Sequence, residues 1–233
     1  MNAYVYERLW RWFYATEGPV PYMYLDSRGL VTVGIGFMID PIEDYIKQWG
    51  KSFTKQDGTA AIPDEVTTEF NRVKKMMDKK GAHLNFKPGA QLFLPAGAMK
   101  PTVLSILRSK ENALKTDWRN TFFSQFETFP PDAQMGVLST AYGSFGNRTT
   151  AEVAFNNACK TQDWAAAADS GRWDGWRPEK IAGHKLMFKN AQVAKDTKDT
   201  NPHPAFPGTL NADGYEIDDT IRPYNQNIWK TGG

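Results

Sequence analysis

The sequence predicts an α+β fold that is predominantly α, with a small N-terminal β-hairpin lobe and a helical C-terminal lobe. Three observations lead to this prediction. Apolar side chains recur at helical spacing over residues 3–16, apolar and polar side chains alternate over 23–35, and helical patterns return between 64 and 194. A chain of 233 residues is long enough to bury a substantial core, as one large domain or as two coupled lobes.

Residues 3–16 form the first predicted helix, and Glu17 lies on its last turn. Gly18 follows as a helix-stop residue, and Pro19 prevents the helix from continuing. The C-terminus of a helix carries partial negative charge, which favours a carboxyl group that keeps its proton. A general acid needs such a protonated carboxyl group, so the position makes Glu17 a candidate for this role. The apolar stripe of the helix consists of Tyr4, Tyr6, Leu9, Trp10, Phe13 and Tyr14.

The alternating segment that follows predicts a β-hairpin. Its three-residue loop ends at Gly29, which takes the left-handed conformation. In this register Asp26 lies opposite Leu30 and Tyr24 lies opposite Thr32. Asp26 and Thr32 are then diagonal neighbours, about 7–8 Å apart at their backbones, and a water molecule could be held between them. The predicted apolar face consists of Met23, Leu25, Val31, Val33 and Ile35.

Two carboxyl groups and a hydroxyl group, on a helix end and a hairpin, suit the hydrolysis of a glycosidic bond. One carboxyl group protonates the leaving oxygen, and the second orients a water molecule on the opposite face of the sugar. Taken singly, each residue has a simpler explanation: Glu17 as an exposed helix-end residue, Asp26 as a turn former and Thr32 as an ordinary strand residue. Their combination favours the catalytic interpretation.

These residues resemble the signature of the phage T4-type lysozymes, in which Glu is followed after eight residues by Asp and after five more by Thr. The spacing from Glu17 to Asp26 and on to Thr32 is the same, and the glycines of the hairpin match as well. The resemblance covers residues 1–38 well and 130–193 moderately.

The second stretch carries its own matches to this family. Residues 132–142 are similar to the helix that runs through the core of the family's C-terminal lobe, and Arg172 and Lys180 lie in a pattern similar to the one before its closing helix. The chain departs from the family at two positions, because Phe37 stands where the family has His and Lys180 stands where it has Arg. Lysine can neutralise Glu17 as a point charge but cannot form the paired hydrogen bonds of arginine.

The resemblance implies a lysozyme-like catalytic domain over 1–193, followed by a C-terminal coil extension over 194–233 that packs on the body. Within the domain it implies an N-terminal lobe at about 14–63, a linking helix at about 64–80 and a C-terminal helical lobe at about 98–193.

The activity implied by the resemblance is that of a glycoside hydrolase. It is a muramidase that cleaves the β-1,4 bond between N-acetylmuramic acid and N-acetylglucosamine in peptidoglycan. Glu17 would be the acid, and Asp26 with Thr32 would activate the water. The reaction inverts the anomeric carbon if the two carboxyl groups lie about 6.5–9.5 Å apart.

Tyr24, Arg172 and Lys180 are the candidate substrate-binding residues, and peptidoglycan is the expected partner of a monomer that needs no cofactor. Either a phage endolysin or a secreted antibacterial effector fits, with an immunity protein or a delivery component as a further partner. Two other classes stay open. One is a non-catalytic cell-wall or glycan-binding module, and the other is a structural component of a phage tail or secretion system.

Turn and helix signals describe the rest of the chain. Residues 40–63 are rich in turns, and a helix opens at Asp64 and ends at Gly81. The face of this helix opposite its apolar stripe is basic, and is either a solvated surface or a contact for a glycan polymer. That basic face consists of Arg72, Lys74, Lys75, Lys79 and Lys80. A short strand is expected at 91–94, and helices are expected at about 101–115, 117–127, 131–143, 150–160 and 178–194.

Composition argues against several other kinds of site. The three histidines lie far apart, which argues against a metal centre, and 34–36 lacks the further glycine that a phosphate-binding loop needs. The net charge of +2 gives no reason to expect nucleic acid as a partner. Cys159 is the single cysteine and is expected to be a buried, unreactive thiol.

The N-terminal residues lack a basic segment followed by an apolar run, and no window is apolar enough to cross a bilayer. We therefore expect a chain that is synthesised in the cytoplasm without a signal peptide and does not insert stably into a membrane. It would reach the cell wall, in the periplasm of a target or host bacterium, by another delivery route.

Overall fold

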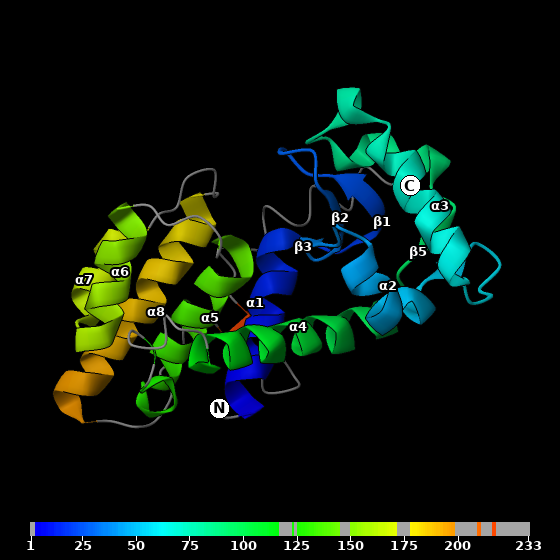
Figure 1. Ribbon diagram of the computed structural model, residues 1–233. Helices are drawn as coiled ribbons and strands as arrows, with labels where there is room; N and C mark the ends of the chain where they lie inside the picture. The colour runs from blue at the N-terminus through cyan, green and yellow to red at the C-terminus, as the bar shows by residue number, and fades with distance from the viewer. Residues whose placement is uncertain are drawn as a thin grey trace. The chain divides into compact units, whose positions relative to one another are not determined.

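A computed structural model describes residues 3–116, 123, 125–144, 150–171, 178–198, 209–210 and 216–217 (Figure 1). These residues form a mixed α+β fold that is mostly helical and contains a small antiparallel sheet. The α-helices are α1 (Ala3–Glu17), α2 (Glu43–Trp49), α3 (Pro63–Lys74), α4 (Ala96–Thr116), α5 (Pro131–Ser144), α6 (Thr150–Thr161), α7 (Trp164–Ser170) and α8 (Pro178–Thr197). The strands are β1 (Val20–Leu25), β2 (Val31–Gly34), β3 (Phe37–Met38), β4 (Thr54–Lys55), β5 (Leu92–Phe93), β6 (Thr209–Leu210) and β7 (Glu216–Ile217). Short 3-10 helices are η1 (Gly50–Ser52), η2 (Met77–Lys79), η3 (His83–Gly89) and η5 (Phe126–Thr128).

The chain divides into two compact units. Residues 17–105 form the sheet unit, whereas the described parts of 1–16 and 106–233 form the helical unit. Helix α1 belongs to the helical unit except for Glu17, and α4 begins in the sheet unit and ends in the helical unit.

The sheet unit is built on five antiparallel strands in the order β3-β2-β1-β5-β4. Helix α3 packs on this sheet through Val66, Phe70 and Val73, which are all buried (Figure 1). The face of the β1–β2 hairpin predicted to be apolar is completely buried, because every one of its members is shielded from solvent. These members are Met23, Leu25, Val31, Val33 and Ile35.

The predicted hairpin register is confirmed. Tyr24 pairs with Thr32, and the backbone N–H of Asp26 donates to the carbonyl oxygen of Leu30 at 2.9 Å. Gly29 has φ +80°, which is the left-handed conformation expected at the end of the loop. The sequence did not reveal that β3 adds to the other edge of β2 or that β5 adds to the other edge of β1.

The helix predicted to run from Asp64 to Gly81 is shorter in the structure. Helix α3 begins at Pro63 and ends at Lys74, and the separate turn η2 follows it. After η2, the N–H of Gly81 donates to the carbonyl oxygen of Leu25 at 3.0 Å, which ties this segment to the hairpin.

Two short helices are not predicted by the sequence patterns. Helix α2 lies in the segment 40–63, where turns are expected, and α7 begins after Asp163, whose carboxylate accepts the N–H of Ala166 at 2.9 Å. The predicted helices 131–143, 150–160 and 178–194 correspond to α5, α6 and α8, and the short strand predicted at 91–94 is β5. Most of the helix predicted over 117–127 lies outside the described residues.

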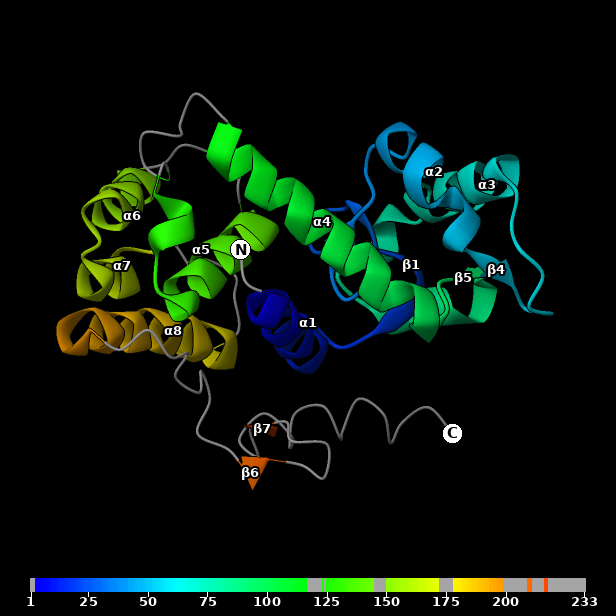
Figure 2. The same ribbon diagram turned by 90° about the horizontal axis from the view of Figure 1, so that it is seen from below.

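In the helical unit, α8 packs against α5 and α7, and α6 packs against α7 (Figure 2). The ring of Phe188 on α8 is fully buried and contacts Phe155 and Trp164. Gly136 on α5 faces the same ring so closely that a methyl group there would lie 2.5 Å from its tip. Cys159 is buried on α6 as expected, and burial raises the pKa of its thiol.

No helix among the residues described is both long and apolar enough to cross a membrane. The extension predicted over 194–233 lies mostly outside the described residues. Its described parts are the end of α8 and the paired strands β6 and β7.

Candidate functional site

Glu17 is the last residue of α1, and Gly18 after it has φ +72°, a conformation that ends the helix as predicted. The carboxyl group of Glu17 lies against the backbone of Gly36 in the turn between β2 and β3. A methyl group built on Gly36 would lie 3.3 Å from Oε2 of Glu17. The missing side chain of Gly36 therefore provides the room in which this carboxyl group lies.

Asp26 is partly exposed at the end of β1, and its two carboxylate oxygens have different surroundings. Oδ1 accepts the backbone N–H of Arg28 at 2.8 Å and that of Leu30 at 2.9 Å. Oδ2 lies 3.5 Å from Nε of Arg28, whose side chain is largely exposed. Oδ1 is thus held by the backbone of the hairpin loop, while Oδ2 faces the exposed guanidinium group of Arg28.

Thr32 is only 4% exposed, which is more buried than the sequence suggested. The cause is β3, because Met38 pairs with Thr32 on one side while Tyr24 pairs with it on the other. The hydroxyl group donates to the carbonyl oxygen of Leu30 at 3.2 Å. Its lone pairs are then left as hydrogen-bond acceptors.

The strand register arranges the three predicted catalytic residues along one part of the sheet unit. Asp26 is diagonal to Thr32 across β1 and β2, about 7–8 Å away at the backbone, whereas Gly36 lies in the turn that follows the other end of β2. Because Glu17 contacts Gly36, the order along this part of the sheet is Glu17, Thr32, Asp26.

The carboxylate of Asp40 also holds the hairpin in place, and the sequence alone did not identify it. Oδ2 of Asp40 accepts the backbone N–H of Val31 at 3.2 Å and forms an ion pair with Lys74 on α3. The ammonium group of Lys74 also donates to the carbonyl oxygen of Gly29 at 3.0 Å. Lys74 is therefore a structural residue that joins α3 to the hairpin, and it is not part of a freely solvated face.

The three predicted substrate-binding residues have different outcomes. The ring of Tyr24 lies edge-on to His83, with ring centroids 5.9 Å apart, next to Thr32. Lys180 lies in the helical unit, with its ammonium group 6.0 Å from the centre of the Trp12 ring. Arg172 lies outside the described residues. The neutralisation of Glu17 by Lys180 stays a prediction.

The helical unit contains a buried histidine that resembles part of a catalytic pair. Nε2 of His184 lies 2.7 Å from the hydroxyl oxygen of Ser139, and the ring contacts Trp12 edge-on. Burial lowers the pKa of His184 well below its usual value, and the charge of Lys180 lowers it further. Because both side chains are completely buried, we interpret this pair as a structural contact in the core.

A pocket of about 540 Å³ lies elsewhere on the sheet unit, between α3 and the strands β4 and β5. None of the three predicted catalytic residues lines it. Glu69 is among its lining residues; it is almost fully buried and binds Arg72 through both carboxylate oxygens at 2.8 Å. Within the described ranges, no group of His, Cys, Asp and Glu side chains has an arrangement that could hold a metal ion.

The geometry thus joins Glu17, Asp26 and Thr32 in one unit, and the lysozyme resemblance stays a prediction. Comparisons of the chain with models of protein families, with curated proteins and with solved structures found no match.

Proposed function

We propose that the protein is a muramidase that hydrolyses the β-1,4 bond between N-acetylmuramic acid and N-acetylglucosamine in peptidoglycan. The observation that carries this proposal is the order Glu17, Thr32, Asp26 along one part of the sheet unit, with Glu17 against Gly36. An inverting glycosidase uses two carboxyl groups, one to protonate the leaving oxygen and one to activate a water molecule, and Glu17 and Asp26 are the candidates for these two roles.

In this proposal the water molecule is oriented by two acceptors. Thr32 already donates its hydroxyl proton to Leu30, and Oδ1 of Asp26 is occupied by two N–H groups. The lone pairs of Thr32 and Oδ2 of Asp26 can therefore accept the two protons of one water molecule. Its oxygen then presents a lone pair to the anomeric carbon, and Asp26 takes the released proton as the C–O bond forms.

Glu17 completes the reaction at the other end of the bond. Its proton passes to the glycosidic oxygen as the bond between this oxygen and the anomeric carbon breaks, so the leaving sugar departs as a neutral alcohol. After the reaction Glu17 is ionised and Asp26 is protonated, and exchange with solvent restores both groups.

The test is the release of soluble muropeptides from purified murein by the whole chain. Glu17→Gln removes the proton donor with little change in shape, and we expect it to release at least about 100-fold less material. Glu7→Gln, on the same helix, is the matched control and should act like the wild type. Undiminished release by Glu17→Gln would refute the proposal.

The stereochemistry provides a second test. An inverting reaction on a β-linked glycan yields the α-anomer first, which proton NMR detects before mutarotation. Initial formation of the β-anomer would show that a nucleophile from the chain or from the substrate attacks the anomeric carbon before water does, and that the water site described above is wrong.

Two observations favour a non-catalytic glycan-binding module as a second candidate. Thr32 is almost completely shielded from solvent, and none of the three catalytic candidates lines the pocket between α3, β4 and β5. This candidate predicts that the wild-type chain sediments with murein but releases no fragments from it.

A further inference from the structure

The basic charge of the chain is concentrated in one segment. Residues 74–87 hold five lysines and one aspartate, a charge of +4, whereas the other 219 residues hold 23 basic and 25 acidic residues, a charge of −2. Lys74 is used to bind Asp40 and the hairpin, so it does not contribute to a free surface. The remaining four lysines define the lysine patch: Lys75, Lys79, Lys80 and Lys87.

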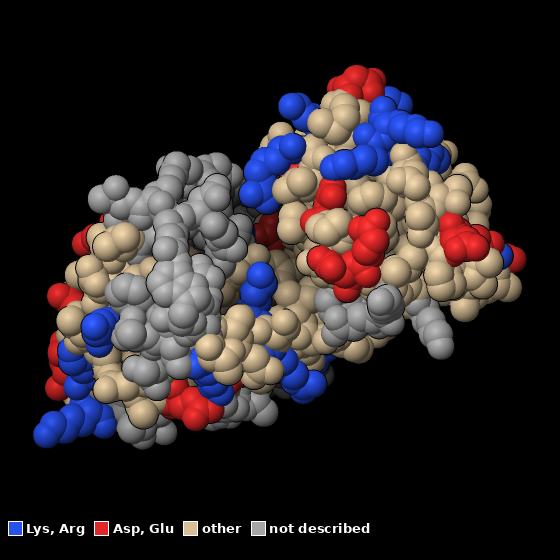
Figure 3. All heavy atoms as spheres, in the orientation of Figure 1, with Lys and Arg blue, Asp and Glu red and all other residues tan. Residues whose placement is uncertain are grey.

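These four ammonium groups are available to a partner. Lys75, Lys80 and Lys87 are exposed and Lys79 is partly exposed. Across the described part of the chain, none of the four forms an ion pair with a carboxylate. Figure 3 shows lysine and arginine side chains gathered on the surface above α3.

Two exposed apolar side chains lie within the lysine patch. Met77 is 46% exposed and Leu84 is 53% exposed. Side chains three residues apart lie above one another on a 3-10 helix. Leu84 is therefore next to Lys87 within η3. Lys80 directly follows η2 and donates its backbone N–H to the carbonyl oxygen of Met77 at 3.4 Å, which places the two residues one turn apart. The same arrangement, an apolar side chain beside a lysine, occurs twice.

The lysine patch is held firmly by the rest of the sheet unit. Phe86 anchors η3, since its ring is completely buried while Leu84 points outward. The sulfur and methyl group of Met77 lie over Gly29, where a side chain would come within 2.5 Å of the methyl carbon. The N–H of Gly81 bonds to the hairpin at Leu25. The backbone that carries the lysine patch is therefore already ordered before a partner binds.

We propose that the lysine patch docks the protein on the surface of an anionic phospholipid bilayer. Lysines near such a surface are attracted to its phosphate groups. Their long alkyl chains can lie along apolar surface while the ammonium groups stay at the level of the headgroups. Leu84 and the exposed part of Met77 would then lie at the boundary between headgroups and acyl chains. This inference does not depend on the proposed hydrolysis.

The apolar side chains distinguish a bilayer from a soluble polyanion. A phosphate-rich polymer would use the lysines alone and would gain nothing from Met77 or Leu84. A bilayer interacts favourably with both the lysines and the apolar side chains, because burial of the apolar side chains adds to the electrostatic attraction and persists when salt screens the charges. The pairing of each apolar residue with a lysine therefore favours the bilayer.

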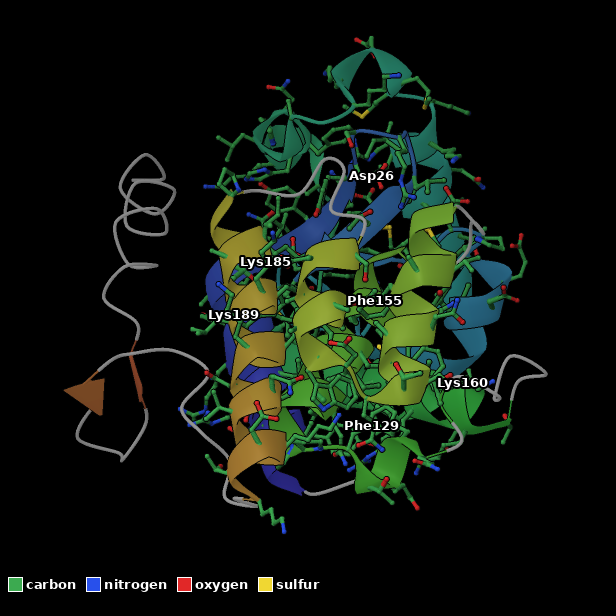
Figure 4. The ribbon with its side chains drawn as sticks, turned by 90° about the vertical axis from the view of Figure 1, so that its left-hand side faces the viewer. Asp26, Phe129, Phe155, Lys160, Lys185 and Lys189 are labelled. Atoms are coloured by element: carbon green, nitrogen blue, oxygen red, sulfur yellow. The ribbon has the colours of Figure 1, made fainter. Side chains whose placement is uncertain are left out.

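The test measures binding of the whole chain to vesicles by sedimentation. Phosphatidylglycerol mixed with phosphatidylcholine provides the anionic surface, and phosphatidylcholine alone provides the neutral one. Replacing the four patch lysines by Gln should weaken binding to anionic vesicles about 100-fold, because each lysine contributes several-fold. The matched control replaces four lysines on α8 and directly after it by Gln, namely Lys185, Lys189, Lys195 and Lys198, of which Figure 4 labels the first two. It removes the same charge and should change binding less than about threefold.

Leu84→Ser tests the apolar contact, and we expect about fivefold weaker binding to anionic vesicles from the lost burial of half a leucine. Circular dichroism confirms that each variant is folded. Equal losses in the patch and control variants would overturn the proposal, because net charge alone would then explain binding. Unchanged vesicle binding by Leu84→Ser, with equally tight wild-type binding to soluble polyphosphate, would overturn it in favour of a polyanion site.

Discussion

Replacing Gly136 by Ala places a methyl group where the structure has the ring of Phe188. The new carbon would lie 2.5 Å from the tip of the ring and 2.8 Å from the two neighbouring ring carbons. Ordinary carbon–carbon contacts are about 3.5–4.0 Å, so the ring would have to move by about 1 Å. It has no free space for this movement, because it is completely buried between Phe155 and Trp164.

Two opposing effects determine the stability of this variant. Alanine in a helix is about 1 kcal/mol better than glycine, which favours the substitution. Overpacking a dense core costs about 1–3 kcal/mol, and the depth of this overlap places Gly136→Ala near the upper limit. We therefore expect a net loss of about 2 kcal/mol, or a decrease of about 4–8 °C in the melting temperature of a chain of this size.

Gly97 is the matched control, because it also lies in a helix but a methyl group added to it would have no neighbouring atom within 4 Å. Gly97→Ala should keep the stability of the wild type or raise it by up to about 1 kcal/mol. Urea unfolding followed by circular dichroism measures both variants. Adding Phe188→Leu to Gly136→Ala should recover at least about 1 kcal/mol relative to the sum of the single changes. If Gly136→Ala is as stable as Gly97→Ala, the described contact between α5 and α8 is wrong.

Three further predictions concern the sheet unit and the buried histidine. Glu69→Ala should cost about 2–3 kcal/mol of unfolding free energy in urea, at the lower end for a buried pair because Arg72 is partly exposed. Glu65→Ala removes a partly exposed pair with Lys55 and the hydrogen bond from the N–H of Ile62 that caps α3, and it should cost less; equal losses would contradict this reasoning. The folded state keeps His184 neutral, whereas the unfolded chain binds a proton below about pH 6.5, so the free energy of unfolding should decrease below this pH by up to about 1.4 kcal/mol per pH unit. Urea midpoints measured against pH should fall less steeply for His184→Gln than for the wild type, and an equal slope would refute this assignment. Gly36→Ala should reduce murein hydrolysis at least about tenfold by displacing the carboxyl group of Glu17. Gly58 has a similar positive φ but a methyl group there would have no neighbour within 4 Å, so Gly58→Ala should keep the wild-type activity; equal losses in the two variants would show that backbone strain, and not the contact with Glu17, is responsible.

The hairpin could be predicted from the sequence because its signals are local. Alternation fixes which side chains face the core, and Gly29 fixes the loop, so the register follows without knowledge of the rest of the chain. The start of α3 and the positions of α5 and α6 follow in the same way from apolar spacing and helix-opening residues.

The parts that could not be predicted depend on contacts between distant residues. Strand β5 joins β4 through the pairing of Phe93 with Thr54, and no local pattern links these residues. The basic face predicted on the helix after Asp64 was partly wrong for the same reason. Arg72 binds the buried Glu69 and Lys74 binds Asp40, so only the lysines after α3 remain free for solvent or a partner.

The candidate site was predicted in part. Spacing and register indicated that Asp26 and Thr32 are neighbours, and the structure confirms this register. The contact of Glu17 with Gly36 and the covering of Thr32 both depend on β3, a two-residue strand too short to leave a signal in the sequence.

The single thiol has a consequence for where the protein can work. Cys159 is enclosed within α6, and burial raises the pKa of its thiol, so oxidants and disulfide exchange have little access to the reactive thiolate. No other cysteine in the 233 residues could pair with it. The stability of the folded protein should therefore be the same in a reducing cytoplasm and an oxidising periplasm, and its melting temperature should not change when a reductant is added.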